Sequence, residues 1–84
     1  MSLEVRWQPR ALRDLKKLDP PVQRRVIGAV KYLAQTGEGD VKRLVNVEPP
    51  EYRLRVGDWR VRFARDEERR LVVLRVLPRG KAYL

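Results

Sequence analysis

The chain has 84 residues, a formal charge of +9, and neither cysteine nor histidine. A chain of this length folds as one unit with a modest core, so we expect a single domain over residues 1–84. The missing cysteines exclude disulfides and thiolate metal sites. The missing histidines exclude histidine-based nucleophilic catalysis and the usual zinc sites.

Arginine supplies 15 of the 20 basic residues. Guanidinium groups bind phosphates through two parallel hydrogen bonds and stack on bases, whereas lysine acts as a point charge. A nucleic acid or another acidic partner is therefore the expected ligand. The chain contains no apolar run of about 18 residues, and its start, MSLEVRWQ, is typical of a strand rather than a signal peptide. We expect a cytoplasmic protein without a membrane segment.

The first third of the chain predicts a short strand followed by two helices. The strand alternates apolar and charged residues, with Leu3, Val5 and Trp7 on one face. A first helix begins near Pro9 and breaks at residues 19–21, Asp-Pro-Pro. The second helix takes Asp19 as its N-cap and ends near Gly37, and its apolar stripe consists of Val22, Val26, Ala29, Val30 and Leu33. Two helices joined by so short a turn predict an antiparallel helical hairpin.

Residues 37–50 are punctuated by glycine and proline and predict a loop or a short extended segment. The next stretch, YRLRVGDWRVRF over residues 52–63, alternates arginine with large apolar residues on both sides of a Gly-Asp step. Such a step is typical of a tight hairpin, so we expect strands over about residues 51–56 and 59–65. A charged turn then leads to a last strand over about residues 70–77.

The last strand is apolar at both parities. We expect Val72, Leu74 and Val76 to face the core and Arg75 to face solvent, although the opposite parity remains open. The predicted fold is therefore α+β: an N-terminal strand, a helical hairpin, and a three-stranded antiparallel meander. The strands form one sheet with the helices on one face, so the other face is solvated.

On this solvated face the alternation gathers arginines from all three meander strands, namely Arg53, Arg55, Arg60, Arg62 and Arg75. A charged strand face is usually only solvated, and acids such as Glu51 could pair with it. However, like charges stacked across neighbouring strands repel one another by a few tenths of a kcal/mol or more, which favours a functional role. The helices add a second basic surface that includes Lys16, Lys17 and Arg24. This surface is either only solvated or binds a nucleic-acid backbone.

The helical hairpin, the YRLRVGDWRVRF segment and the closing LVVLRVLPRGKAY together resemble the RelE/ParE toxin superfamily of bacterial toxin–antitoxin pairs over essentially the whole chain. The resemblance implies a compact sheet against two N-terminal helices. In its RelE branch it implies a ribosome-dependent endoribonuclease that cuts messenger RNA in the decoding site, and in its ParE branch a protein that poisons DNA gyrase. It also implies an antitoxin protein as partner.

The resemblance places phosphate-binding groups at Arg53, Arg60 and Arg79, with Arg55 as a further basic residue and Tyr83 as the C-terminal tyrosine. RNA cleavage by its own 2′-hydroxyl needs a proton acceptor, donors to the phosphorane and an acid for the leaving oxygen. We assign the three arginines as clamps and Lys81 as a candidate acid. Tyr83 either stacks on a base, takes part in proton transfer, or packs back onto the sheet. Arg55, Arg62, Arg75, Lys16, Lys17 and Arg24 are the expected RNA contacts.

Two positions depart from the pattern of relatives. Residues 77–78 are Leu-Pro where relatives often have Gly-His, so a histidine acid or base is missing. Glu51 stands where some relatives have lysine, and we expect either a general base or a salt-bridge partner. The leading expectation is a toxin that cuts ribosome-bound mRNA without metal or cofactor. The alternatives are a gyrase inhibitor that cuts nothing and a non-catalytic RNA-binding module.

Overall fold

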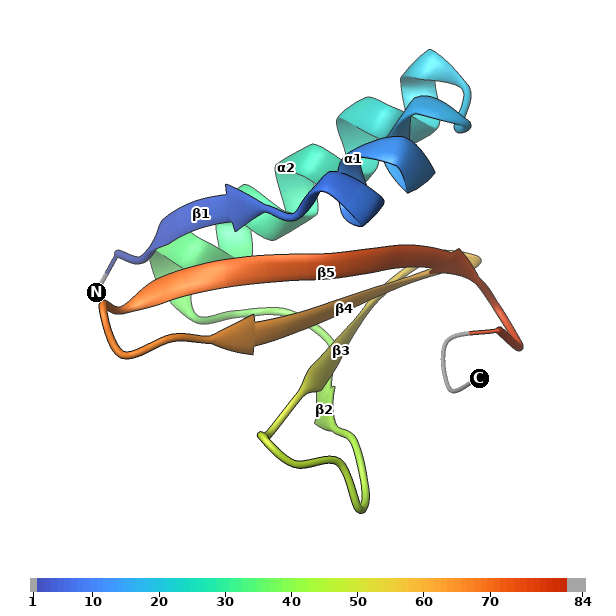
Figure 1. The fold of residues 1–84 in the computed structure, drawn as a ribbon. Coiled ribbons are helices and arrows are strands. Elements are labelled where there is room, and N and C mark those ends of the chain that lie inside the picture. Colours follow the sequence, from blue (N-terminus) through green and yellow to red (C-terminus); the bar gives the residue numbers. More distant parts are fainter. Residues whose placement is uncertain (1, 82–84) are drawn as a thin grey trace.

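The structure is a computed structural model that describes residues 2–81. The elements in chain order are β1 (Glu4–Trp7), α1 (Pro9–Lys16), α2 (Pro20–Thr36), β2 (Val41–Arg43), β3 (Tyr52–Val56), β4 (Trp59–Arg65) and β5 (Arg70–Pro78). The strands form one sheet in the order β1-β5-β4-β3-β2. Both helices lie on the same side of this sheet and run in opposite directions (Figure 1). The predicted α+β fold is confirmed.

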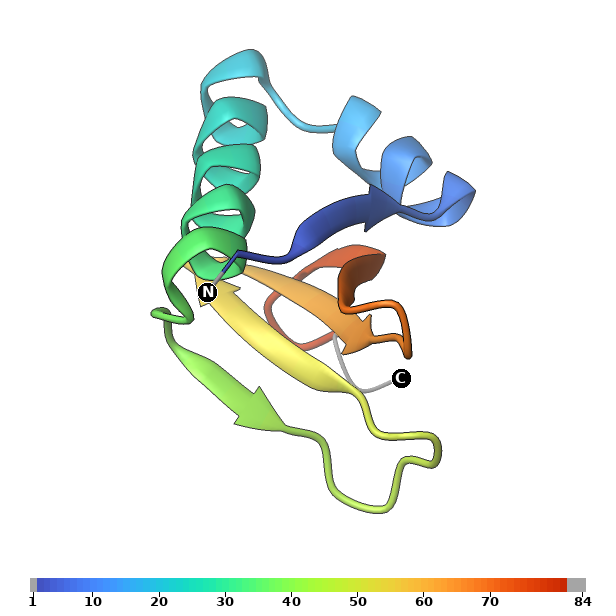
Figure 2. The ribbon, with the colours of Figure 1, turned by 90° about the vertical axis from the view of Figure 1, so that its left-hand side faces the viewer.

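The sheet has five strands rather than the four that the sequence predicts. Residues 41–43, within the stretch predicted as a loop or short extended segment, form the edge strand β2, which pairs antiparallel with β3. At the opposite edge β1 pairs parallel with β5. The two helices carry the chain from β1 across one face to β2 at the opposite edge, and the chain returns through β3 and β4 to β5, which pairs parallel with β1 (Figure 2).

The ends of α2 follow its sequence signals. Pro20 occupies the first turn, where its missing N–H costs nothing. Gly37 ends the helix with φ 78°, and its N–H donates to the Leu33 carbonyl oxygen at 2.8 Å. Asp19 stands at the N-cap as predicted, but its side chain makes no capping hydrogen bond. Neither helix within residues 2–81 is long and apolar enough to cross a lipid bilayer.

The core lies between α2 and the helix-facing side of the sheet. The predicted stripe of α2 is buried at Val26, Val30 and Leu33, and Val22 and Ala29 pack at its border. From the sheet it meets Leu54, Val56, Val61, Phe63, Leu71, Val73 and Val76. These residues alternate along β3 and β4, so every second residue is left for the face of the sheet away from the helices, which we call the outer face.

The predicted parity of β5 is only half right. Arg62 pairs with Arg75 but Phe63 pairs with Val73, so Leu74 is an extra residue in a β-bulge. The bulge reverses the alternation, and both Val73 and Val76 face the core. Val72 and Leu74, predicted as core residues, lie on the outer face instead. Val72 is still only 9% exposed, because it lies in a hollow lined by Pro49 and Pro50 of the β2–β3 connection.

Candidate functional site

The arginines of the hairpin face one another across the outer face. Arg53 of β3 is the register partner of Arg62 of β4, which in turn pairs with Arg75 of β5. Two residues nearer the turn, Arg55 and Arg60 form a second facing pair. Directly opposite residues of an antiparallel pair share a face. The arginines of β3, β4 and β5 therefore share the outer face, as the alternation predicted.

The three arginines of the central row each have a carboxylate partner. Arg53 Nη1 lies 3.5 Å from Asp40 Oδ1, Arg62 donates to Glu51, and Arg75 donates to Asp14. We call Arg53, Arg62 and Arg75 the paired row. Their side chains are 11%, 19% and 28% exposed, in that order. Burial on both sides makes the Arg62–Glu51 and Arg75–Asp14 pairs costly to break, whereas Asp40 is 59% exposed.

Asp14 of α1 makes the most complete of these contacts. Its two oxygens accept hydrogen bonds from Arg75 Nε at 2.8 Å and Nη2 at 3.2 Å, and Oδ2 also accepts from the Val76 backbone N–H at 2.9 Å. Val76 lies on β5 beyond the end of β1, where the strand edge has no neighbouring strand. Asp14 thus both neutralises Arg75 and satisfies an open edge of the sheet.

The pKa of Asp14 reflects these contacts. Burial of the side chain would raise it, but the hydrogen bonds from Arg75 and Val76 outweigh burial and hold the pKa below its ordinary value. The same hydrogen bond raises the pKa of Arg75. Both groups are therefore charged at neutral pH.

Glu51 is the partner of Arg62, with Glu51 Oε1 2.5 Å from Arg62 Nη2. The sequence left two roles for Glu51, a general base or a salt-bridge partner, and this contact matches the salt bridge. Arg62 keeps unused donor capacity, because its buried Nε has no acceptor among residues 2–81. The buried Nε of Arg53 likewise has no acceptor among residues 2–81.

A second group of cations lies at the hairpin end of the outer face. Arg55, Arg79 and Lys81 are exposed, and Arg60 is half-buried. Within residues 2–81 none of the four forms an ion pair. Arg60 Nη1 donates to the carbonyl oxygens of Gly57, at 2.9 Å, and Trp59, at 3.1 Å. We call Arg55, Arg60, Arg79 and Lys81 the hairpin-end cations.

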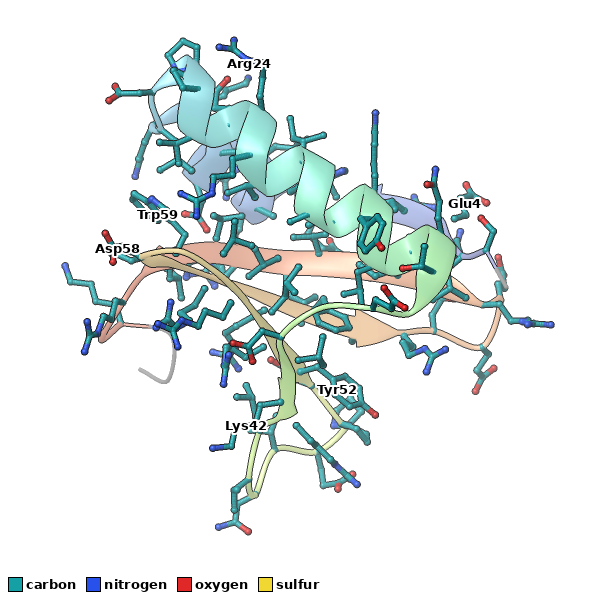
Figure 3. The ribbon with its side chains drawn as sticks, turned by 180° about the vertical axis from the view of Figure 1, so that it is seen from behind. Glu4, Arg24, Lys42, Tyr52, Asp58 and Trp59 are labelled. Atoms are coloured by element: carbon teal, nitrogen blue, oxygen red, sulfur yellow. The ribbon has the colours of Figure 1, made fainter. Side chains whose placement is uncertain are left out.

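The backbone fixes the position of this second group. The Arg79 N–H donates to the Asp58 carbonyl oxygen at 2.8 Å, which ties the residue after β5 to the β3–β4 turn. Figure 3 shows Asp58 and Trp59 at this end of the sheet, and beyond β5 the chain turns toward the outer face (Figure 1). Gly57 adopts φ 58°, and a Cβ there would lie 3.0 Å from Arg25 Nη2 of α2. The left-handed backbone of the turn therefore favours glycine at this position.

The remaining predicted RNA contacts lie elsewhere. Lys16 and Lys17 are exposed at the end of α1, on the helix side of the sheet. Arg24 projects from α2 away from the sheet, on the opposite side of the molecule from Lys42 (Figure 3). Arg24 and the outer face therefore do not form one continuous surface. Tyr83 lies outside the described residues.

Two of the three carboxylates that neutralise the paired row, Asp14 and Asp40, are residues that sequence reasoning missed. Glu51 was considered because it shares the parity of Arg53. Asp14 is 61 residues from Arg75, and no periodicity connects the two positions. Asp40 precedes β2, whose pairing with β3 was not predicted.

The arrangement separates two kinds of chemistry on one face. A charge already matched by a carboxylate gains little from a phosphate, since the carboxylate must first be displaced and left unpaired. The hairpin-end cations have no such competitor within residues 2–81. Fixed guanidinium and ammonium groups can stabilise the charge of a pentacovalent phosphorane, provided that they lie where that charge develops.

Comparison with known proteins agrees with this architecture. Residues 5–83 match the family model of the ParE toxin of type II toxin–antitoxin systems. Among solved structures, the chain resembles an archaeal RelE–RelB complex from Pyrococcus horikoshii OT3, with 25% identity and a TM-score of 0.78 over 98% of this chain and 100% of that one. It also resembles the toxin–antitoxin complex RelBE2 from Mycobacterium tuberculosis, with 28% identity and a TM-score of 0.80 over 96% of this chain and 95% of that one.

No curated protein matches the sequence. The family match nevertheless spans almost the whole chain, and both similar structures are toxins bound to their antitoxins. The chain therefore belongs to the ParE toxin family of type II toxin–antitoxin systems, within the RelE/ParE superfamily.

Proposed function

We propose that this toxin is a cytoplasmic, ribosome-dependent endoribonuclease that cuts messenger RNA in the ribosomal A site. The scissile phosphate binds at the hairpin-end cations. The observation that supports the proposal is the facing pair Arg55–Arg60, joined by Arg79, with no carboxylate partner for any of them within residues 2–81.

In the proposed reaction the ribose 2′-oxygen attacks the adjacent phosphorus as its proton passes to a water molecule or to the Tyr83 phenolate. The bond to the 5′-oxygen then breaks and that oxygen takes up a proton, which yields a 2′,3′-cyclic phosphate and a 5′-hydroxyl. Arg60 and Arg79 stabilise the phosphorane, each contributing about 10²–10³ in rate. Lys81 protonates the leaving oxygen, and Tyr83 stacks on a base or takes part in proton transfer.

Arg53 has a smaller part in this proposal than the family resemblance implies. Its side chain is 11% exposed and lies against Asp40, so it stabilises the hairpin rather than binding the phosphate. Arg62 and Arg75 likewise position the strands that carry the hairpin-end cations. RNA contacts at Lys16, Lys17 and Arg24 would be to more distant parts of the ribosomal complex, because these residues lie on the helix side.

A gyrase inhibitor is the second candidate. The family model that matches is that of ParE, and three arginines of the outer face already have carboxylate partners. In that case the hairpin-end cations bind an acidic protein surface and no bond is cut.

A cognate antitoxin is the proposed partner in either case. Both similar structures are complexes with an antitoxin. An acidic segment that orders on binding would neutralise the exposed arginines and cover the phosphate site. A short acidic protein encoded in the neighbouring reading frame would support this proposal.

Toe-printing of messages on purified translating ribosomes tests the proposal. The wild type should produce A-site cuts that disappear with Arg60→Ala and with Arg79→Ala. Arg13→Ala, which removes an exposed arginine from α1, is the matched control and should cut normally. Intact message together with gyrase-linked DNA breaks would overturn the nuclease and favour the second candidate.

A further inference from the structure

A hollow of about 480 Å³ opens on the outer face beside the paired row. It lies between the start of α1 and the middle of β4 and β5. Its wall includes Gln8, Arg10, Glu51, Arg62, Leu74 and Arg75. Neither the family match nor the similar structures assign a role to it, and the phosphate site proposed above does not include it.

The charges of this hollow are already balanced where they are most buried. Arg62 pairs with Glu51, and Arg75 pairs with Asp14. Leu74, the extra residue of the β5 bulge, contributes an apolar side chain to its wall. An apolar side chain beside charges that are already paired suits a nucleobase, and Arg10, which forms no ion pair within residues 2–81, can contact the phosphate of the same nucleotide.

Gln8 supplies an uncommitted amide at the rim. Its backbone N–H donates to the Val73 carbonyl oxygen at 2.9 Å, which fixes the main chain against β5. Its side chain does not cap α1 and has no hydrogen-bond partner within residues 2–81. A free side-chain amide on a fixed backbone can donate to and accept from the edge of a base, as glutamine does with adenine.

The hollow is close enough to the hairpin-end cations to serve the same RNA strand. Arg62 follows Arg60 by two residues on the same face of β4, which corresponds to about 7 Å along the strand. From Arg62 the hollow continues past Arg75 toward Gln8, a further two strand spacings or about 10 Å. A short stretch of nucleotides beside the scissile phosphate can span this distance.

We propose that this hollow is a base-binding subsite, in which Leu74 supports the face of one unstacked base and Gln8 hydrogen-bonds its edge. The proposal rests on the proposed RNA substrate and names the site at which the toxin recognises the base sequence of that RNA. The toxin then has a nucleotide preference of its own at one position that flanks the cut.

An NMR titration with short single-stranded RNA tests the subsite without the ribosome. The probes are 2′-O-methyl tetranucleotides, which cannot be cut. There is one probe for each of the four bases and one that carries an abasic residue. The Gln8 side-chain amide and the Leu74 methyl groups should shift with at least one base. They should not shift with the abasic probe or with inorganic pyrophosphate.

Binding constants of the four probes provide the second measurement. Gln8→Ala should reduce the preference among bases from about tenfold to within twofold. Gln35→Ala, which removes an exposed glutamine from α2, should leave the preference unchanged. Leu74→Ala should weaken the binding of all four probes. It provides a second test of the subsite if Gln8→Ala disturbs the start of α1.

The outcomes separate this inference from the nuclease proposal. Equal shifts with the abasic probe, or an unchanged preference in Gln8→Ala, would overturn the subsite even if the wild type cuts message on ribosomes. Base-dependent shifts in a protein that cuts nothing would support the subsite and overturn the nuclease. Shifts at Gln8 with an acidic peptide but with no RNA probe would make the hollow a protein contact and overturn the subsite.

Discussion

Two groups of cations share the outer face and differ in what surrounds them. The paired row sits in the middle of the sheet, and the three carboxylates come from a helix, from the residue before β2 and from the residue before β3. Arg55 and Arg60 are two residues nearer the turn, and within residues 2–81 none of the hairpin-end cations forms an ion pair. The same residue type on the same face thus holds the sheet together in one place and remains available to a ligand in the other.

The difference shows that an arginine-rich strand face is not evidence of a binding site at every position. An arginine is available to a phosphate only where the fold supplies no internal acid. Introducing or removing such acids should therefore convert one region into the other.

The largest expected effect comes from giving the hairpin-end cations an internal acid. Leu77 is the register partner of Arg60 and shares its face. Leu77→Glu should form a cross-strand ion pair worth about 0.2–1 kcal/mol of stability and should lower the rate of mRNA cleavage by about 10²–10³, the value of one lost donor. Single-turnover cleavage on ribosomes and thermal unfolding measure the two effects. Leu77→Gln is the control for shape, and equal rate losses in both variants would contradict the explanation by charge.

Removing an acid from the paired row should cost stability instead. Asp14→Asn leaves Arg75 without its partner and weakens the hydrogen bond to the Val76 N–H, so unfolding free energy should fall by about 2 kcal/mol. Urea unfolding measures the change. Asp19 belongs to the same helical hairpin, and its side chain makes no capping hydrogen bond. Asp19→Asn should therefore lower the unfolding free energy by less than about 0.5 kcal/mol. Equal losses in the two variants would show that the Asp14–Arg75 pair does not stabilise the fold.

The Glu51–Arg62 pair should contribute less to stability, and only when both side chains are present. A double-mutant cycle with Glu51→Gln and Arg62→Gln should give a coupling energy of about 1 kcal/mol. A coupling near zero would mean that the contact, although only about one fifth exposed on each side, does not contribute to the stability of the paired row.

The pH dependence of stability gives the smallest effect. The lowered pKa of Asp14 means that the folded chain binds its proton less readily than the unfolded chain. Its contribution is therefore complete above the ordinary aspartate pKa of about 3.9 and is lost as pH falls from there through the lowered value. The stability difference between wild type and Asp14→Asn should be constant near pH 6 and should shrink toward pH 3. A difference that stays constant or grows in acid would contradict this assignment.

Most of the fold could be predicted because local signals agree with it. The Gly57–Asp58 turn, the proline at the start of α2 and the alternation of β3 and β4 each depend on neighbouring residues. The parity of β5 could not be predicted in the same way, since residues 71–74 are all apolar and a bulge leaves no mark in such a run.

The candidate site was predictable only as a set of positively charged groups. Register placed Arg55 opposite Arg60, as the hairpin required. Which arginines remain unpaired depends on Asp14 and Asp40, whose contacts join distant parts of the chain. Those contacts follow from tertiary packing, and no spacing in the sequence encodes them.

The most direct test compares two neighbouring arginines of one strand, Arg60 and Arg62. Each is replaced by glutamine, and single-turnover cleavage of ribosome-bound message is measured per folded molecule. The account predicts that Arg60→Gln loses about 100-fold or more in rate, while Arg62→Gln keeps most of its rate and loses stability. Equal losses of rate, or the larger loss in Arg62→Gln, would contradict it.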